Sequence, residues 1–177
     1  MGRVAVSTFA PTLVLASGLL VLARPAQADP EPVRQQGNLA LGLGGGTSTA
    51  GISAKYFLRE SLSLQGVLGA GYGSDRWSDG PGGGWDSGLG LGADLLFEMP
   101  AFHETPEVEL AWSVGPGVGL WLTDDWAALA ASGVAGFEVN VSAVPIDLVI
   151  EYRPRLLVVP DLAFDFVNFS GHIRYVF

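Results

Sequence analysis

The last eleven residues of the chain alternate between apolar and polar side chains. The apolar set is Val167, Phe169, Ile173, Tyr175 and Phe177, and the polar set is Asn168, Ser170, His172 and Arg174. Because successive side chains of a strand point to opposite faces, this period of two predicts a β-strand. One face of that strand is too apolar for a solvated edge, and the other is too polar for a buried core. A barrel strand with lipid on one side and a lumen on the other fits both faces.

Seven further segments show the same alternation, and turn-forming residues separate them. These segments are 38–46, 51–58, 61–73, 85–98, 108–122, 127–141 and 146–155. Together with residues 167–177 they give eight strands, each near the roughly ten residues that a tilted membrane-spanning strand needs. The pattern therefore predicts an all-β fold, an eight-stranded antiparallel up-and-down transmembrane β-barrel over residues 38–177.

The composition of the polar face indicates which face meets lipid. Glycine and serine dominate it, whereas the lysines and glutamates of a solvated surface are sparse. We therefore expect the apolar face to point outward and the polar face to enclose a lumen. The side chains expected in the lumen charge network are Lys55, Gln65, Asp94, Glu98, Glu109, Glu138, Asp147, Glu151, Arg153, His172 and Arg174. The alternative is a secreted soluble barrel or sandwich with the two faces inverted.

The expected hairpin registers bring some of these lumen residues together. Lys55, Gln65 and Asp94 are expected in one row. A second group is expected in the periplasmic half, and it contains Glu109, Asn140, Asp147, His172 and Arg174. Carboxylates outnumber cations inside, so either some carboxylates are protonated, or water and a cation share the lumen. The pattern thus allows a closed salt-bridge network or a narrow cation-leaning pore.

A different pattern marks the beginning of the chain. Arg3 precedes an apolar run over residues 4–22, and Ala26-Gln27-Ala28 has the small residues of a signal-peptidase site. We predict a cleavable signal peptide over residues 1–28, followed by a short periplasmic lead-in over residues 29–37. A transmembrane anchor is the alternative because the run approaches spanning length, but the cleavage site disfavours it.

Charge and cysteine content narrow the function classes. The formal net charge is −9, and it would become about −11 once Arg3 and Arg24 leave with the signal peptide. Such an acidic chain is a poor candidate for binding nucleic acid. The chain has no cysteine, which excludes disulfides, thiolate metal sites and thiol catalysis. No cofactor is indicated.

The C-terminal residues resemble a signal found in a known family. A final strand with apolar and aromatic residues at alternate positions, here Ile173, Tyr175 and Phe177, resembles the closing strand and assembly signal of bacterial outer-membrane β-barrels. With its eight predicted strands, the mature chain is similar to the small OmpA- and OmpX-type barrels. The resemblance implies recognition by the barrel-insertion machinery and contact with outer-membrane lipid. It also implies a role in envelope integrity, adhesion or partner binding.

Four external loops follow from the predicted topology, over residues 47–50, 74–84, 123–126 and 156–163. The candidate interaction residues in them are Asp75, Arg76, Trp77, Asp79, Asp124, Asp125 and Trp126. Their carboxylates could hold calcium, but they match no calcium-loop spacing, so solvated turns are favoured. The tryptophans could contact an extracellular protein partner, or they belong to the interfacial aromatic belt, which is the default.

A catalytic alternative combines Ser170 and His172 with a carboxylate such as Asp147, since some outer-membrane barrels are lipid-modifying hydrolases. Both Ser170 and His172 are expected to face the lumen, whereas a lipid substrate would approach from outside. We therefore expect no enzyme and no metal site. The expected function is a structural or surface-interaction role in the bacterial outer membrane, and the narrow pore and the lipid-modifying enzyme are the alternatives.

Overall fold

The structure, a computed structural model, describes residues 32–46, 49–73, 86–123 and 127–177. Its regular elements are β1 (Leu39–Gly46), β2 (Thr49–Arg59), β3 (Leu62–Gly73), β4 (Asp86–Glu104), β5 (Val108–Leu122), β6 (Ala127–Val141), β7 (Ile146–Tyr152), β8 (Arg155–Val159), β9 (Ala163–Asp165) and β10 (Phe169–Val176). Within the described ranges, no helix has the length and apolarity needed to cross a membrane.

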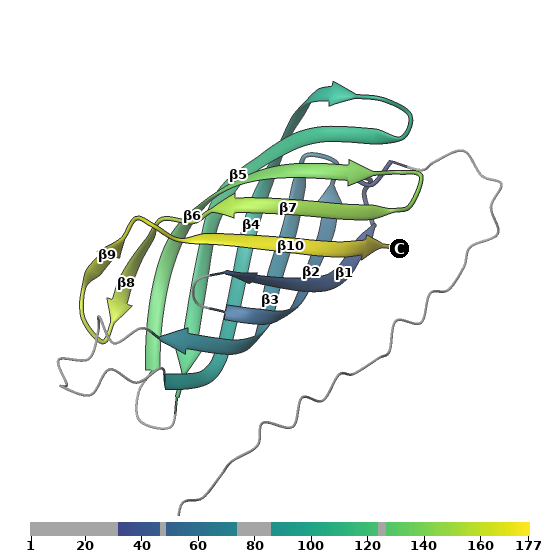
Figure 1. Ribbon diagram of the computed structural model, residues 1–177. Coiled ribbons are helices and arrows are strands. Elements are labelled where there is room, and N and C mark those ends of the chain that lie inside the picture. The colour runs from purple at the N-terminus through teal and green to yellow at the C-terminus, as the bar shows by residue number, and fades with distance from the viewer. Residues whose placement is uncertain (1–31, 47–48, 74–85, 124–126) are drawn as a thin grey trace, which may run out of the picture.

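The strands form a closed antiparallel barrel (Figure 1). Neighbouring strands follow the order β5-β4-β3-β2-β1-β10-β7-β6, and the pairing of β5 with β6 closes the ring. β8 continues β7 along β6, and β9 pairs with β8 before the chain enters β10. β7 and β8 together count as one interrupted strand of the barrel, and β9 and β10 together count as another. The prediction of an all-β, eight-stranded, up-and-down barrel is therefore confirmed.

The register determines the stagger of the barrel. The cross-strand pairs can be followed around the barrel, from each residue to its partner on the next strand. Starting at His172 on β10 and passing through β1, β2, β3, β4 and β5, this path reaches Ala128 on β6. In the other direction, the partners lead through β7 to Glu138 on the same strand. This offset of ten residues is the shear of the barrel. With eight strands it corresponds to a strand tilt of about 40° and to a lumen that side chains can fill.

The alternation of side chains sorts apolar from charged residues across the barrel wall. Large apolar side chains lie on the outer face, where Leu43 is 64% exposed and Ile150 is 67% exposed. Lys55 and Asp147 point inward and are fully buried. Phe57 on β2 is also inward and buried, although the polar pattern did not single it out. The interior is therefore mainly polar and the exterior apolar.

Two strands match their predicted bounds, and a third is longer. β5 and β6 cover the predicted residues 108–122 and 127–141, which confirms both strands. β4 continues to Glu104, beyond the end of the predicted segment 85–98. His103 lies in this extension and pairs with Leu110. Figure 1 shows the β4–β5 hairpin projecting beyond the neighbouring strands.

The predicted external loop over residues 156–163 is also wrong. β8 pairs with β6, where Leu157 lies opposite Ala130. Leu157 is buried against Ala128 and Ala130 and packs beside Trp121. This inward contact holds the chain on the barrel wall beyond the break at residues 153–154, so the run continues as a strand.

Several predictions concern residues outside the described ranges. The signal peptide over residues 1–28 is one of them. The external-loop candidates Asp75, Arg76, Trp77, Asp79, Asp124, Asp125 and Trp126 are the others.

Candidate functional site

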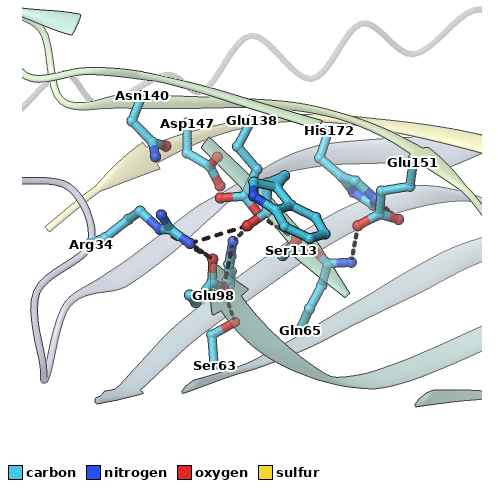
Figure 2. A network of polar contacts seen from close by, with 12 residues as sticks. Arg34, Ser63, Gln65, Glu98, Ser113, Glu138, Asn140, Asp147, Glu151 and His172 are labelled. Atoms are coloured by element: carbon cyan, nitrogen blue, oxygen red, sulfur yellow. Dashed lines mark hydrogen bonds and ion pairs between the residues drawn. The ribbon is translucent and has the colours of Figure 1, made fainter. Parts of the chain in front are cut away.

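The polar side chains of the lumen form three connected groups, because inward positions of neighbouring strands lie opposite one another. We name them the Lys55 group, the Arg174 group and the Glu151 group. Figure 2 shows members of all three, which project from several strands toward the barrel interior. Together they cross the lumen from the end near the chain's N-terminal lead-in to a small cavity at the other end.

The Lys55 group contains a lysine between two carboxylates. Lys55 Nζ lies 2.9 Å from Glu98 Oε1 and 2.9 Å from Glu138 Oε1, and all three side chains are fully buried. Ser63 donates a hydrogen bond to Glu98, and Ser113 Oγ donates one to Glu138 Oε1 at 2.5 Å. Because β2, β4 and β6 supply the charged groups, this ion-pair cluster joins strands that are not neighbours in the wall.

Arg34 extends the Lys55 group from the lead-in that precedes β1. Its Nη2 donates to Glu98 Oε2 at 2.7 Å, and its Nη1 donates to Glu109 Oε1 at 3.1 Å and to the Met99 carbonyl at 2.8 Å. Burial disfavours the charged guanidinium, but the carboxylates of Glu98 and Glu138 outweigh this and raise the pKa of Arg34. Arg34 therefore occupies one mouth of the lumen as a cation.

The backbone around Arg34 explains how the lead-in reaches the lumen. Gly37 has φ +90°, a left-handed conformation that glycine adopts without strain. Its N–H donates to the Phe57 carbonyl at 2.8 Å, which fixes the turn against β2. Val33 is buried in a cluster with Ala40 and Val176. These contacts hold residues 32–37 against the barrel end and aim Arg34 inward.

The Arg174 group lies in the same half of the lumen. Arg174 Nε donates to Asp147 Oδ2 at 2.8 Å, and Arg174 Nη1 donates to Gln65 Oε1 at 2.5 Å. Asn140 lies opposite Asp147 and donates through Nδ2 to Glu109 Oε2 at 3.3 Å. Through Arg174, which also lies 3.4 Å from Ser53 Oγ, this group joins the last strand to β2, β3 and β7.

The Glu151 group lies farther along the lumen. Glu151 accepts hydrogen bonds from Gln65 Nε2 at 2.7 Å and Ser170 Oγ at 2.7 Å, and its Oε2 lies 3.1 Å from His172 Nε2. Arg153 pairs with both Glu151 and Asp94. Gln65 therefore links this group to the Arg174 group.

Three buried oxygens of the network accept no hydrogen bond from the described residues: Glu138 Oε2, Asn140 Oδ1 and Asp147 Oδ1. Buried polar atoms normally have a partner in the protein or an ordered water. These oxygens are therefore the places in the lumen where an ordered water would find a hydrogen-bond acceptor.

A cavity of about 70 Å³ adjoins the Glu151 group, and we name it the vestibule. Arg153, Ser170 and His172 line its polar side. Trp121 lines it as well and donates through Nε1 to Thr49 Oγ1 at 3.0 Å. The vestibule lies at the end of the lumen opposite Arg34.

The structure places the predicted lumen residues largely as neighbours. Lys55 lies opposite Gln65, and Gln65 lies opposite Asp94, so the three share one row. Within the second expected group, Ser53 Oγ joins His172 to Arg174, since it lies 3.0 Å from His172 Nδ1 and 3.4 Å from Arg174 Nη1. His172 lies opposite Val149 and contacts Glu151, because its position on β10 is two residues farther along the lumen than that of Arg174.

The catalytic alternative does not have the expected geometry. Asp147 pairs with Arg174, and Ser170 donates to Glu151 instead of contacting His172. The other ring nitrogen of His172, Nδ1, lies 3.0 Å from Ser53 Oγ. Ser53 has no exposed surface, so a substrate could not reach its hydroxyl in this arrangement.

Sequence reasoning did not single out Arg34, Trp121, Ser63 or Ser113, although Ser63 and Ser113 bind the lumen carboxylates Glu98 and Glu138. Arg34 stands in a polar segment with prolines, where nothing local separates it from a solvated arginine. A stronger signal was available for Trp121, because it follows Gly115, Gly117 and Gly119 at the alternate positions of β5, and it lies opposite Gly90 of β4.

The residues that resemble an assembly signal, Ile173, Tyr175 and Phe177, lie at the end of the barrel wall. Ile173 is on the outer face and 53% exposed. The rings of Tyr175 and Phe177 lie 5.0 Å apart, and the Phe177 N–H donates to the Leu39 carbonyl at 2.9 Å. The last strand is thereby joined to the first.

Comparisons with protein-family models, with curated proteins and with solved structures find no match for this chain. Among the residues that the structure describes, no three histidine or acidic side chains are grouped so that they could hold a metal ion. The functional conclusion therefore depends on the geometry of the barrel itself.

Proposed function

We propose that this protein is an integral β-barrel of the bacterial outer membrane, with a closed lumen and a structural or surface-interaction role. The observation that carries the proposal is the distribution of side chains. Charged residues such as Lys55 and Glu151 are fully buried inside, whereas large apolar side chains such as Ile150 and Phe164 are more than half exposed outside. Water would favour the opposite arrangement, and a lipid environment favours this one.

The height of the apolar outer surface supports this environment. Outward-facing Leu148, Ile150, Tyr152 and Val158 are all exposed. From Ile146 to Val158, a rise of about 3.3 Å per residue at a tilt of about 40° gives a height of about 30 Å. This height equals the thickness of a typical hydrocarbon core, about 30 Å.

The lumen contacts support a closed barrel over the narrow cation-leaning pore. The Lys55 group spans the interior with ion pairs of 2.9 Å, and Arg34 occupies the adjacent mouth. An ion on this path would have to displace charge-assisted hydrogen bonds in a confined space. We therefore infer that the barrel is electrically silent in its native state.

Export and assembly belong to the same proposal. An outer-membrane location requires a signal such as the one expected over residues 1–28, and recognition by the insertion machinery is expected to depend on Ile173, Tyr175 and Phe177. Partner binding through external segments would give the barrel its surface role. A lipid-modifying activity lacks support from the site, because Ser170 and His172 both bind Glu151 instead of each other.

The first experiment is heat-modifiable gel mobility of the mature chain, refolded in detergent micelles. A closed membrane barrel should migrate differently before and after boiling. The absence of a shift, together with solubility in plain buffer, would contradict the membrane proposal and favour a secreted soluble barrel.

Planar-bilayer recordings then separate the closed barrel from the pore. We expect no discrete conductance steps from the native chain. Steps that change when Glu109 or Glu138 is replaced by glutamine would instead establish the pore.

A further inference from the structure

The three buried oxygens that accept no hydrogen bond from the described residues lie at neighbouring positions of β6 and β7. Asn140 on β6 lies directly opposite Asp147 on β7, and Glu138 precedes Asn140 by two residues, so it projects from the same face of the wall. Side chains at opposite positions have Cβ atoms about 4.5–5.5 Å apart, and long side chains also reach their diagonal neighbours. Figure 2 shows Glu138, Asn140 and Asp147 side by side in the lumen. We name these three residues the acceptor cluster.

The two carboxylates of the acceptor cluster are each held through one oxygen. Glu138 Oε1 lies 2.9 Å from Lys55 Nζ, and Asp147 Oδ2 accepts a hydrogen bond from Arg174 Nε at 2.8 Å. The other oxygens, Glu138 Oε2 and Asp147 Oδ1, accept none from the described residues, and both residues are fully buried. The ion pairs therefore fix both carboxylates and leave one acceptor on each.

Asn140 contributes the third acceptor. Its Nδ2 donates to Glu109 Oε2 at 3.3 Å, so Oδ1 is the atom of the amide that is left over. Among the described residues, the one other buried side-chain atom without a hydrogen bond is Arg174 Nη2, which lies 2.7 Å from Asp147 Oδ2 and thus has an ion-pair partner. The acceptor cluster therefore lacks a donor or a cation for its three oxygens.

The charges around the acceptor cluster do not balance. The Lys55 group and the Arg174 group adjoin, because Lys55 is within electrostatic reach of Asp147 and Arg174 as well as of its two ion-pair partners. The cations of the two groups are Arg34, Lys55 and Arg174, and the carboxylates are Glu98, Glu109, Glu138 and Asp147. Three positive and four negative charges give a net charge of −1. Even Glu109, at the mouth, has a side chain that is only 19% exposed. Because an unbalanced buried charge is costly, a ligand that carries one positive charge suits this place.

This charge and the three acceptors together narrow the ligand class. An ionised carboxylate and an amide oxygen accept hydrogen bonds but donate none. A single water has only two O–H donors, so it would leave one oxygen unsatisfied, and it would not change the net charge. A divalent ion would reverse the sign of the imbalance, and Ca²⁺ prefers more oxygen ligands than the cluster offers. A monovalent metal cation fits both requirements, since protein oxygens replace the hydration shell of such ions.

We propose that the acceptor cluster binds one monovalent metal cation, such as Na⁺, through Glu138 Oε2, Asn140 Oδ1 and Asp147 Oδ1. The inference rests on the closed lumen of the proposed function and adds a bound ion to it. The site consists of two carboxylates and an amide, so it needs no group of three acidic or histidine side chains. Because all three residues are fully buried, the ion is enclosed when the barrel closes and belongs to the folded state.

The test is the sodium dependence of folding. The full chain, folded in phosphatidylcholine vesicles, is unfolded with urea in mixtures of sodium chloride and choline chloride at constant ionic strength. Choline is too bulky for an enclosed site, so it keeps the ionic strength without replacing Na⁺. A cation that binds only the folded chain raises the folding equilibrium constant about tenfold for each tenfold increase in its concentration above the dissociation constant. We expect this dependence for the native chain. A folding equilibrium constant that does not change with sodium would overturn the proposal and leave the three oxygens to ordered water.

Two buried amides provide a matched pair of variants. Asn140→Leu removes the amide oxygen at similar volume and without a change of charge, so it should abolish the sodium dependence. Gln65→Met removes another buried amide, whose oxygen and nitrogen are both engaged by Arg174 and Glu151. Gln65→Met should destabilise the barrel and preserve the sodium dependence. A dependence that survives in Asn140→Leu, or that Gln65→Met also abolishes, would contradict the assignment of the ion to the acceptor cluster.

Asn140→Asp provides a second test at the same position, which decides the matter where Asn140→Leu does not fold. It keeps an oxygen ligand and adds a negative charge, so the sodium concentration at half-saturation should fall. An unchanged or higher concentration would overturn the site.

Bilayer recordings separate this inference from the closed barrel. Conductance steps in the native chain would overturn the closed lumen, and the enclosed cation with it. A silent barrel whose folding does not depend on sodium would overturn the cation site alone. Heat-modifiable mobility of the same samples tests the membrane location independently, because an enclosed cation does not require lipid.

Discussion

Replacement of Lys55 by methionine is the sharpest test of the lumen network. Methionine is similar in length and apolar, so Lys55→Met removes the charge while keeping most of the side-chain volume. Lys55 Nζ lies 2.9 Å from both Glu98 Oε1 and Glu138 Oε1, and none of the three side chains is exposed. The substitution thus leaves two buried carboxylates without their shared cation.

The two carboxylates differ in the contacts that they retain. Glu98 still pairs with Arg34 at 2.7 Å. Glu138 keeps the hydrogen bond from Ser113, but its Oε2 already accepts none. The substitution therefore leaves about one uncompensated buried charge, and removal of one partner from a buried pair costs about 3–5 kcal/mol. We expect Lys55→Met to lower the free energy of unfolding by that amount.

The assay is urea-induced unfolding of the barrel in lipid vesicles, followed by tryptophan fluorescence. Arg59→Met is the matched control, because Arg59 lies exposed at the end of the same strand. Its effect should stay within about 0.5 kcal/mol. The double variant Lys55→Met with Glu138→Gln should recover about 1–3 kcal/mol of the loss, since contacting residues couple by such amounts.

A small effect would refute this reasoning. Exposed ion pairs contribute about 0–1 kcal/mol. If Lys55→Met costs no more than that, and the double variant recovers nothing, then water reaches the lumen charges and the closed network does not exist.

Three further outcomes follow from the structure. Ile150→Arg places a charge on the outer face near the middle of the apolar band, so in vesicles it should lower the free energy of unfolding by about 2–4 kcal/mol, whereas a soluble barrel would tolerate it. Arg34→Ala removes charge-assisted hydrogen bonds to Glu98 and Glu109 and should cost about 1.5–3 kcal/mol in the same urea titration. Removal of Phe177 should reduce the amount of barrel assembled in bacterial outer membranes while leaving refolding in micelles intact; equal assembly of both chains, measured by gel mobility of membrane fractions, would contradict the assembly role.

The fold could be predicted largely because alternation is a local property of the chain. In β5 and β6, every second residue faces outward without interruption, so the pattern of apolar residues gave both strands their bounds. The row of Lys55, Gln65 and Asp94 followed from the same regularity, because tight hairpins determine which residues lie opposite each other.

The features that the sequence did not predict depend on contacts between residues that are distant in the sequence. Leu156 to Val159 form an apolar run without alternation, because Leu157 packs inward against Ala128 and Ala130 on another strand. The run therefore resembled a loop. Arg34 binds carboxylates 64 and 75 residues away, and no local pattern reports such contacts. The contact of His172 with Glu151 similarly required the observed register between β10 and β7.

The seam between β1 and β10 joins the first strand to the last. It therefore determines the order in which the lumen contacts can form during folding. Arg174 and His172 reach their partners only when β10 is in place, since Gln65 and Ser53 lie on strands made much earlier. Until then, Asp147 and Glu151 lack these donors, and an unclosed sheet inserted in lipid would expose their charges. In the proposed membrane barrel, insertion and closure should therefore proceed together, and the arrival of residues 169–176 would complete both.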